Sequence, residues 1–302
     1  MTDAMTTNRT AILALAAAGA LWGLTVPLSK LSLDWLGGGW LTVIRFSLAA
    51  PLLAYAGRRG LHAALTPQIA AAGAIGFGAV ILLQNAGIER TSVSHAALVV
   101  GAVPVMVALM AAGLGHGIAR PTAWGGYGLA LAGIAMVAGG GGTGATAAGD
   151  LLVFASVALS ATFIVIQPRL LAGRDPAAVT AVQFGAGALV ALPHALVFEG
   201  LPPAPATAAP VVALVALAFA GTLLPFWLFA YGQAHVPAGL AGAFLNLEPL
   251  VGVAVGWVGF GEAVAATQLL GGLAVLAGIA LSTMPARDRS TRRPGRLSPA
   301  PC

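Results

Sequence analysis

Glu248 is an acidic residue in the middle of a long apolar stretch. A charge at the centre of a bilayer costs at least about 2.5 kcal/mol on the lenient insertion scale, so the carboxyl group must be neutral, paired or facing water. Such a group can bind and release a proton, or contact a polar substrate. The alternative is a protonated structural side chain that is hydrogen-bonded between helices.

Arg45 raises the same question for a cation. Its position predicts a depth of roughly 10 Å from the nearest end of its apolar segment, at a rise of about 1.5 Å per residue. A guanidinium can hold a carboxylate or a phosphate at two points, which favours a gate or a substrate contact. The alternative is a structural partner of a nearby acid or helix end.

Other polar and aromatic residues within the apolar stretches could line a cavity. Amides in lipid usually find an interhelical partner, worth about 0.6 to 2 kcal/mol, so helix packing is the alternative for them. Trp and Tyr also act as anchors at membrane interfaces. The candidate substrate-binding residues are Trp22, Arg45, Gln84, Asn85, Gln183, Trp227, Tyr231 and Asn246, and Glu248 is the candidate proton-coupling residue.

Two prolines, Pro104 and Pro249, also lie inside apolar segments. Proline cannot donate the helical hydrogen bond and tends to kink a helix, which frees a carbonyl nearby. We therefore predict a helix kink at each of them.

The sequence lacks the patterns of common enzymes. It has no Gly-Lys-Thr/Ser phosphate loop, no nucleophile elbow and no His-Glu zinc pattern. No histidines or acids have metal-ligand spacing. We predict no enzyme activity, no metal and no cofactor, so active transport would draw on an ion gradient.

Composition sets the class of the protein. Of 302 residues, 59% are hydrophobic and 8% are charged, against about 25% charged in an ordinary soluble domain. So few charges cannot coat a soluble surface, and we predict a membrane protein. The net charge of +5 comes largely from loops and the C-terminal tail, which gives little support to nucleic-acid binding.

Ten apolar segments are long enough to cross about 30 Å of hydrocarbon as helices. Turn-forming residues separate them, and residues 285–302 form an Arg- and Pro-rich tail that should be disordered. The predicted segments are 11–33, 38–56, 68–88, 93–115, 122–140, 150–171, 177–198, 210–232, 236–258 and 264–284.

Basic residues predict the orientation, because cytoplasmic loops retain Lys and Arg. The N-terminus, the even-numbered loops and the tail hold most of them, whereas Lys30 and Arg90 lie on the opposite side and Arg45 lies within a helix. We predict both termini on the cytoplasmic side of an inner membrane. The residues on that side are Arg9, Arg58, Arg59, Arg120, Arg169, Arg174, Arg287, Arg289, Arg292, Arg293 and Arg296.

The two halves of the chain repeat. Residues 131–135 recur identically at 276–280, and at the same shift of 145 Pro104 meets Pro249. Phe46 meets Phe184 at a shift of 138. We predict an all-α membrane protein of ten transmembrane helices, built as two five-helix repeats at 11–141 (the first half) and 149–284 (the second half). Because five is odd, the repeats must be inverted, as in secondary transporters.

Several motifs resemble the EamA branch of the drug/metabolite transporter (DMT) superfamily over residues 11–284. They are Ala20-Leu21-Trp22-Gly23, Arg45-Phe46, Asn246-Leu247-Glu248-Pro249-Leu250, Gly261-Glu262 and Gln268-Leu269-Leu270-Gly271-Gly272. The resemblance implies a ten-helix carrier of metabolites, often an exporter of amino acids, with a cavity lined by both halves. The chain departs from it at Gly115-His116-Gly117, where many relatives carry an acid.

The leading hypothesis is a secondary active transporter that exports a small metabolite by alternating access. The alternatives are a translocator of lipid-linked intermediates and a non-transport membrane enzyme or subunit. The expected partners are a small-molecule substrate and the lipid bilayer, with protons and a second copy of the chain as further candidates.

Overall fold

The computed structural model describes residues 2–113, 121–139, 144–233, 235, 244–263 and 265–283. The regular elements in these ranges are all helices, as the sequence predicts. Those of the first half are α1 (Thr2–Gly23), α2 (Thr25–Leu33), α3 (Gly38–Ala56), α4 (Leu61–Ala64), α5 (Pro67–Gly73), η1 (Ala74–Ala79), α6 (Val80–Glu89), α7 (Val93–Val100), α8 (Val103–Gly113) and α9 (Pro121–Gly139). Those of the second half are α10 (Ala147–Leu171), α11 (Pro176–His194), η2 (Ala195–Glu199), α12 (Ala208–Ala218), η3 (Phe219–Leu223), α13 (Leu224–Gln233), η4 (Phe244–Asn246), α15 (Leu247–Phe260) and α16 (Ala266–Thr283).

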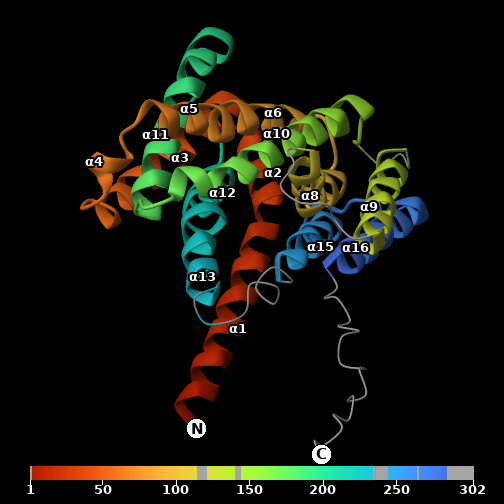
Figure 1. Cartoon of the computed structure of the whole chain (residues 1–302). Coiled ribbons are helices and arrows are strands. Elements are labelled where there is room, and N and C mark those ends of the chain that lie inside the picture. The colour runs from red at the N-terminus through yellow and green to blue at the C-terminus, as the bar shows by residue number, and fades with distance from the viewer. Residues whose placement is uncertain are drawn as a thin grey trace, which may run out of the picture.

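Among the described residues, six helical runs are long and apolar enough to cross a bilayer. They are Arg9–Leu33, Gly38–Ala56, Pro67–Glu89, Ala147–Gln167, Pro176–Glu199 and Ala208–Phe229. The shorter apolar helices are Val93–Val107, Trp124–Met136, Leu247–Phe260 and Ala266–Gly278, and each overlaps one of the other four predicted segments. Figure 1 shows α1 and α2 rising from the N-terminus as one run, with α13 and α12 packed beside them.

Side-chain caps define where several helices begin. The Thr66 hydroxyl accepts from the Ile69 N–H, and the Thr146 hydroxyl accepts from the Gly149 N–H at 3.0 Å. The Asp175 carboxylate accepts from the N–H groups of the first turn of α11, at 2.8 and 3.2 Å. These oxygens satisfy donors that have no partner within the helix. Local sequence therefore sets the ends of α5, α10 and α11.

The predicted helix over residues 93–115 is interrupted. α7 ends at Val100 and α8 begins at Val103, immediately before Pro104. In the second half, α15 begins at Leu247 after the short η4, so Pro249 lies in a first turn. A proline there removes no intrahelical hydrogen bond. Pro249 thus marks a helix start rather than a kink within the described residues, which exclude residues 236–243.

Three wide π turns lie in membrane-length helices, and two of them, η1 and η3, join two α-helices, whereas η2 ends the run that begins with α11. η1 joins α5 to α6 and η3 joins α12 to α13, and their starting residues are 145 positions apart. Gly76 and Gly221 occupy the same place in the two turns. At Gly76 a methyl group would lie 2.5 Å from the Phe163 ring, so the turn needs a glycine there. π turns of this kind are frequent at functional sites.

Helices α9 and α16 pack through reciprocal glycine contacts. A methyl group at Gly133 would lie 2.5 Å from the carbonyl oxygen of Gly271, and one at Gly278 would lie 2.5 Å from that of Gly126. Each glycine therefore admits the backbone of the other helix. Small residues permit this close approach where lipid supplies no hydrophobic force between helices.

The α3–α11 contact is built around aromatic rings. Phe46 and Phe184 are both fully buried, and their ring centroids lie 4.6 Å apart. A second core fills the space between α7, α8, α9 and α10, with Val275 of α16 at its edge. These two cores position the polar residues that lie between the halves.

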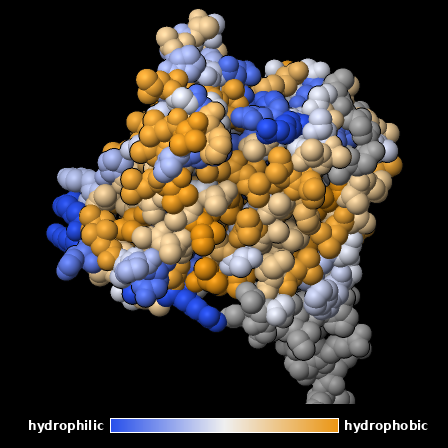
Figure 2. Space-filling model, turned by 90° about the horizontal axis from the view of Figure 1, so that it is seen from above, coloured by the Kyte–Doolittle hydropathy of each residue, from blue (hydrophilic) through white to orange (hydrophobic). Residues whose placement is uncertain are grey.

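The outer surface is apolar. Figure 2 shows one face covered largely by hydrophobic residues, with hydrophilic ones gathered mostly toward its edges. Leu189, Val197 and Val258 are 69%, 73% and 80% exposed. Exposed apolar patches on this scale exceed what a soluble monomer carries. A bilayer is the environment that such a surface fits.

The glycine contact between α9 and α16 predicts the effect of a bulky substitution. Gly133→Leu should lower stability by about 1–3 kcal/mol or prevent folding, because backbone rather than a movable side chain occupies the space. Gly128→Leu is the matched control, since nothing lies within 4 Å of a methyl group there. Thermal melting of the detergent-purified variants measures both. Equal melting temperatures for the two would contradict the packing.

Candidate functional site

A chain of aromatic rings joins helices of the two halves. Phe77 of η1 contacts Phe46, Phe163 and Phe184, with centroids 4.8 to 5.7 Å apart. Phe184 continues to Phe226 at 6.5 Å. Trp22 of α1 then packs edge-on against Phe226 and Phe229, at 5.3 and 5.2 Å. We call these seven rings the aromatic cluster: Trp22, Phe46, Phe77, Phe163, Phe184, Phe226 and Phe229.

Arg45 of α3 lies against this cluster. It is 7% exposed, and its guanidinium carbon is 5.5 Å from the centroid of the Phe46 ring. Its Nε donates to the Thr222 hydroxyl at 2.7 Å, and that hydroxyl donates to the Leu217 carbonyl at 2.8 Å. Thr222 belongs to η3, so the π turn presents the acceptor. A cation over an aromatic face gains further attraction.

The charge of Arg45 has no acidic partner among the described residues. The ion pairs found there join Arg90 to Glu89, His95 to Asp150 and His194 to Glu199. One neutral hydroxyl uses a single donor of the five in a guanidinium. The remaining donors suit an anion held at two points.

Gln183 occupies the position in α11 that matches Arg45 in the repeat. It is fully buried and forms a reciprocal amide pair with Gln167 of α10, at 2.9 and 3.0 Å. This pair stabilises contact within the second half. Gln84 of α6 is partly buried, and its role in binding stays a prediction.

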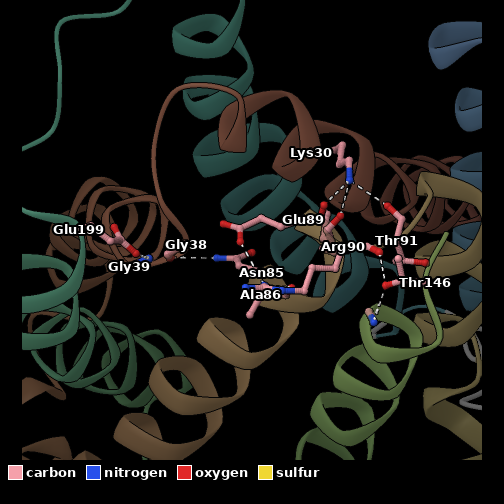
Figure 3. A network of polar contacts seen from close by, with 12 residues as sticks. Lys30, Gly38, Gly39, Asn85, Ala86, Glu89, Arg90, Thr91, Thr146 and Glu199 are labelled. Carbon is pink, nitrogen blue, oxygen red and sulfur yellow. Dashed lines mark hydrogen bonds and ion pairs between the residues drawn. The ribbon is translucent and has the colours of Figure 1, made fainter. Parts of the chain in front are cut away.

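Asn85 lies at the interface of α6 and α3. Its amide donates to the Gly38 carbonyl and to the Thr42 hydroxyl, both at 3.1 Å. Figure 3 shows the bond to Gly38 beside the N-terminus of α3. These bonds join α6 to α3, as expected if Asn85 serves in helix packing, which was the alternative to cavity lining.

The remaining aromatic candidates lie apart from Arg45. Trp227 is 79% exposed, and Tyr231 is 41% exposed and stacks on His235 with centroids 4.5 Å apart. Of the predicted aromatic residues, Trp22 alone joins the aromatic cluster. The side chain of Asn246 lies outside the described residues.

Glu248 lies in the first turn of α15 and is partly buried, not in the middle of a described helix. Within the described residues its carboxyl group has no hydrogen-bond partner. Pro249 beside it is buried, and a methyl group at Gly101 would lie 2.5 Å from its Cβ. The break between α7 and α8 therefore packs against the start of α15. The side chain of Pro104 is not described.

Sequence reasoning missed Thr222, Phe77 and Phe226. Their helices read as uniformly apolar, and neither π turn has a periodic signature. The shift of 145 was the available signal, because it pairs Phe77 with Thr222. The described residues contain no group of three or more histidines, cysteines and acids that could hold a metal ion.

A polar network covers one end of the helices, away from Arg45. Glu199 accepts from the N–H groups of Gly39 and Trp40 at 2.7 and 3.0 Å, and Glu262 accepts from those of Val93 and Ser94 at 2.5 and 2.9 Å. In each case a carboxylate of the second half caps a helix of the first half. Carboxylates at helix N-termini are favourably placed.

Known proteins resemble the chain over most of its length. A "Probable terminal-alkyne amino-acid exporter" of Streptantibioticus cattleyicolor is 28% identical over 297 residues, which are 95% of this chain and 98% of that protein. An "Uncharacterized transporter" of Archaeoglobus fulgidus is 25% identical over 252 residues, 80% of this chain and 86% of its own. Both proteins are named as transporters.

A solved crystal structure has the same fold, with a TM-score of 0.64 over 94% of this chain and 97% of its own, at 21% identity. The profile of the EamA-like transporter family matches residues 9–139 and again residues 147–284. The two matched ranges include all seven rings of the aromatic cluster and all six membrane-length helices. The chain therefore belongs to the EamA-like transporter family of the DMT superfamily and is a multi-pass membrane transporter rather than an enzyme.

Proposed function

We propose that this protein is a secondary carrier that exports a small amino-acid-like metabolite by alternating access. The observation that carries the proposal is the buried guanidinium of Arg45, whose one described hydrogen bond goes to the neutral Thr222. A buried cation without an acidic partner is costly. A carboxylate-bearing substrate lowers that cost when it binds, and the helices on both sides of the site come from different halves.

The chemistry of the aromatic cluster refines the substrate class. Trp22, Phe226 and Phe229 offer apolar and π surfaces, which suit an aliphatic or unsaturated side chain. Arg45 suits the carboxylate of the same molecule. The relative from S. cattleyicolor is named as a probable exporter of a terminal-alkyne amino acid, a class of compound that combines a carboxylate with an unsaturated group. Gln84, Trp227, Tyr231 and Asn246 remain further proposed contacts.

Alternating access requires two related halves, and we propose ten helices in two inverted repeats at 11–141 and 149–284. Three observations support this arrangement. The family profile matches twice, the π turns recur 145 residues apart, and Gly133 and Gly278 make the same contact in exchanged roles. The contact between Phe46 and Phe184, which are repeat-equivalent, would lie on the axis relating the halves.

The first test of this function concerns membrane orientation. We expect reporter fusions after Arg59 and at Cys302 to be cytoplasmic and a fusion near Gly142 to be external, because basic loops stay inside. Paired alkaline phosphatase and fluorescent protein fusions in an inner membrane measure this. An external C-terminus would rule out the inverted arrangement.

The second test concerns Arg45. In proteoliposomes, amino acids should compete for transport, whereas their decarboxylated amines should compete at least about tenfold more weakly, since a charged hydrogen bond contributes about 1.5–3 kcal/mol. Arg45→Gln should lose this discrimination, and Arg45→Lys should recover part of it because Lys keeps the charge but not the two-point grip.

Arg58→Gln is the matched control, because Arg58 is exposed and lies on the Tyr55 ring at the end of α3. Thr222→Val separates structure from binding, since it removes the partner of Arg45 and keeps the guanidinium. If Thr222→Val and Arg45→Gln abolish transport equally, Arg45 holds helices together and does not select substrate.

A further inference from the structure

A second buried ionisable group lies between the halves, in the first turn of α7 and next to the residues that Glu262 caps. His95 of α7 is fully buried, and its Nδ1 lies 2.9 Å from an Asp150 carboxylate oxygen. Asp150 of α10 is 3% exposed, and its other oxygen accepts a short hydrogen bond from the buried Thr91 hydroxyl. The three side chains form a line from Thr91 through Asp150 to His95.

The hydrogen bonding of this line is incomplete at one atom. His95 Nε2 is buried and has no hydrogen-bond partner among the described residues, and the same holds for the neighbouring Ser94 hydroxyl. A buried polar atom without a partner is rare in proteins and calls for an explanation. With one proton shared between Nδ1 and Asp150, Nε2 presents a free lone pair.

The net charge of His95 and Asp150 together changes when a proton binds at His95 Nε2. Neutral His95 with ionised Asp150 carries a net charge of −1, and one proton added at Nε2 gives an imidazolium beside a carboxylate, with a net charge of zero. No covalent bond other than N–H changes. Burial in a medium of low dielectric costs less for a pair with no net charge than for a pair with a net charge.

Other charged groups face this pair from the elements packed around it. Lys30 of α2 donates to the carbonyls of Ile88, Glu89 and Thr91 at 2.6, 3.1 and 2.8 Å, and Figure 3 shows it directly over the start of the line. Glu262, after α15, caps α7. Glu89 and Arg90 end α6 as an exposed pair, and the described parts of α8, α9 and α16 contribute no charge.

Lys30 and Glu262 bond to backbone groups at and just before the start of α7, where His95 and Asp150 are buried. Asp150 and Glu262 come from the second half, whereas His95, Thr91 and Lys30 come from the first. Movement of one half against the other would therefore change both the pairing and the hydration of His95.

Resting on the proposed carrier function, we propose that His95 and Asp150 form the proton-binding site that couples transport to a proton gradient, with His95 Nε2 accepting one proton per cycle. Glu248 is the competing position, but it forms no ion pair with a basic side chain in the described residues. The His95–Asp150 pair has a countercharge, an acceptor atom and a place between the halves.

The transport test compares coupled accumulation with uncoupled exchange in proteoliposomes. A gradient of about one pH unit corresponds to a factor of about ten in an equilibrium constant, so the parent should accumulate substrate up to about tenfold. His95→Gln and Asp150→Asn should stop near equal concentrations on both sides, while still exchanging labelled for unlabelled substrate at close to the parent rate. His194→Gln, at an exposed histidine 3.8 Å from Glu199, is the matched control and should accumulate normally.

Parent-like accumulation by His95→Gln would overturn the proposal, and so would loss of accumulation in Glu248→Gln alone. A parallel fall in exchange, accumulation and melting temperature would also overturn it, because that pattern belongs to a structural side chain.

A direct titration separates this proposal from the carrier function itself. In histidine-labelled protein in detergent, the NMR signal absent from His95→Gln identifies His95, and we expect its Nε2 to bind a proton reversibly as the pH is lowered. If the parent transports no amino acid of the panel, the proposed function fails while this titration still decides the proton site. A His95 signal that stays unchanged across the stable pH range would overturn the site, even in an active carrier.

Discussion

The interior of a bilayer offers no water, so every polar group placed there must find its partner within the protein. The described structure meets this constraint with short chains of hydrogen bonds. Arg45 reaches Thr222 and then a helix carbonyl, Gln183 pairs with Gln167, and Asn85 joins two helices. At His95 the chain of hydrogen bonds ends, and the buried Nε2 atom without a partner indicates a role beyond packing. Buried polar groups whose hydrogen bonds are complete are therefore assigned to packing, and those with a missing partner are candidates for function.

Much of the fold follows from the sequence, because a bilayer imposes length and hydropathy on any helix that crosses it. Six of the expected segments coincide with helices of membrane length, and the other four overlap shorter apolar helices in the described residues. The interruption before Pro104 and the π turns at Gly76 and Gly221 are less accessible. A uniformly apolar segment carries no periodicity that would reveal one residue added to a turn. The contact that requires a glycine at position 76 is with Phe163, which is distant in the sequence.

Residues of the candidate site can be predicted from the sequence where the residue type is unusual for a membrane helix. A lone arginine in an apolar helix demands an explanation, so Arg45 stood out before its surroundings were known. Its partner Thr222 did not, because threonine is common in membrane helices and gains meaning only from the π turn. Asp150 resembles an ordinary acid in the first turn of a helix, favoured there by the helix dipole. Its pairing with His95 depends on a tertiary contact that no local pattern encodes.

The contact between α9 and α16 has a mechanical consequence. A side chain can change rotamer to let one helix slide past another, whereas the backbone atoms that meet at Gly133 and Gly278 cannot yield in this way. The two helices are therefore locked against translation and behave as a single column. If the halves move as alternating access requires, we expect α9 and α16 to move together. The change in backbone geometry would then fall on the segments that are already irregular, the break between α7 and α8 and the wide turns η1 and η3.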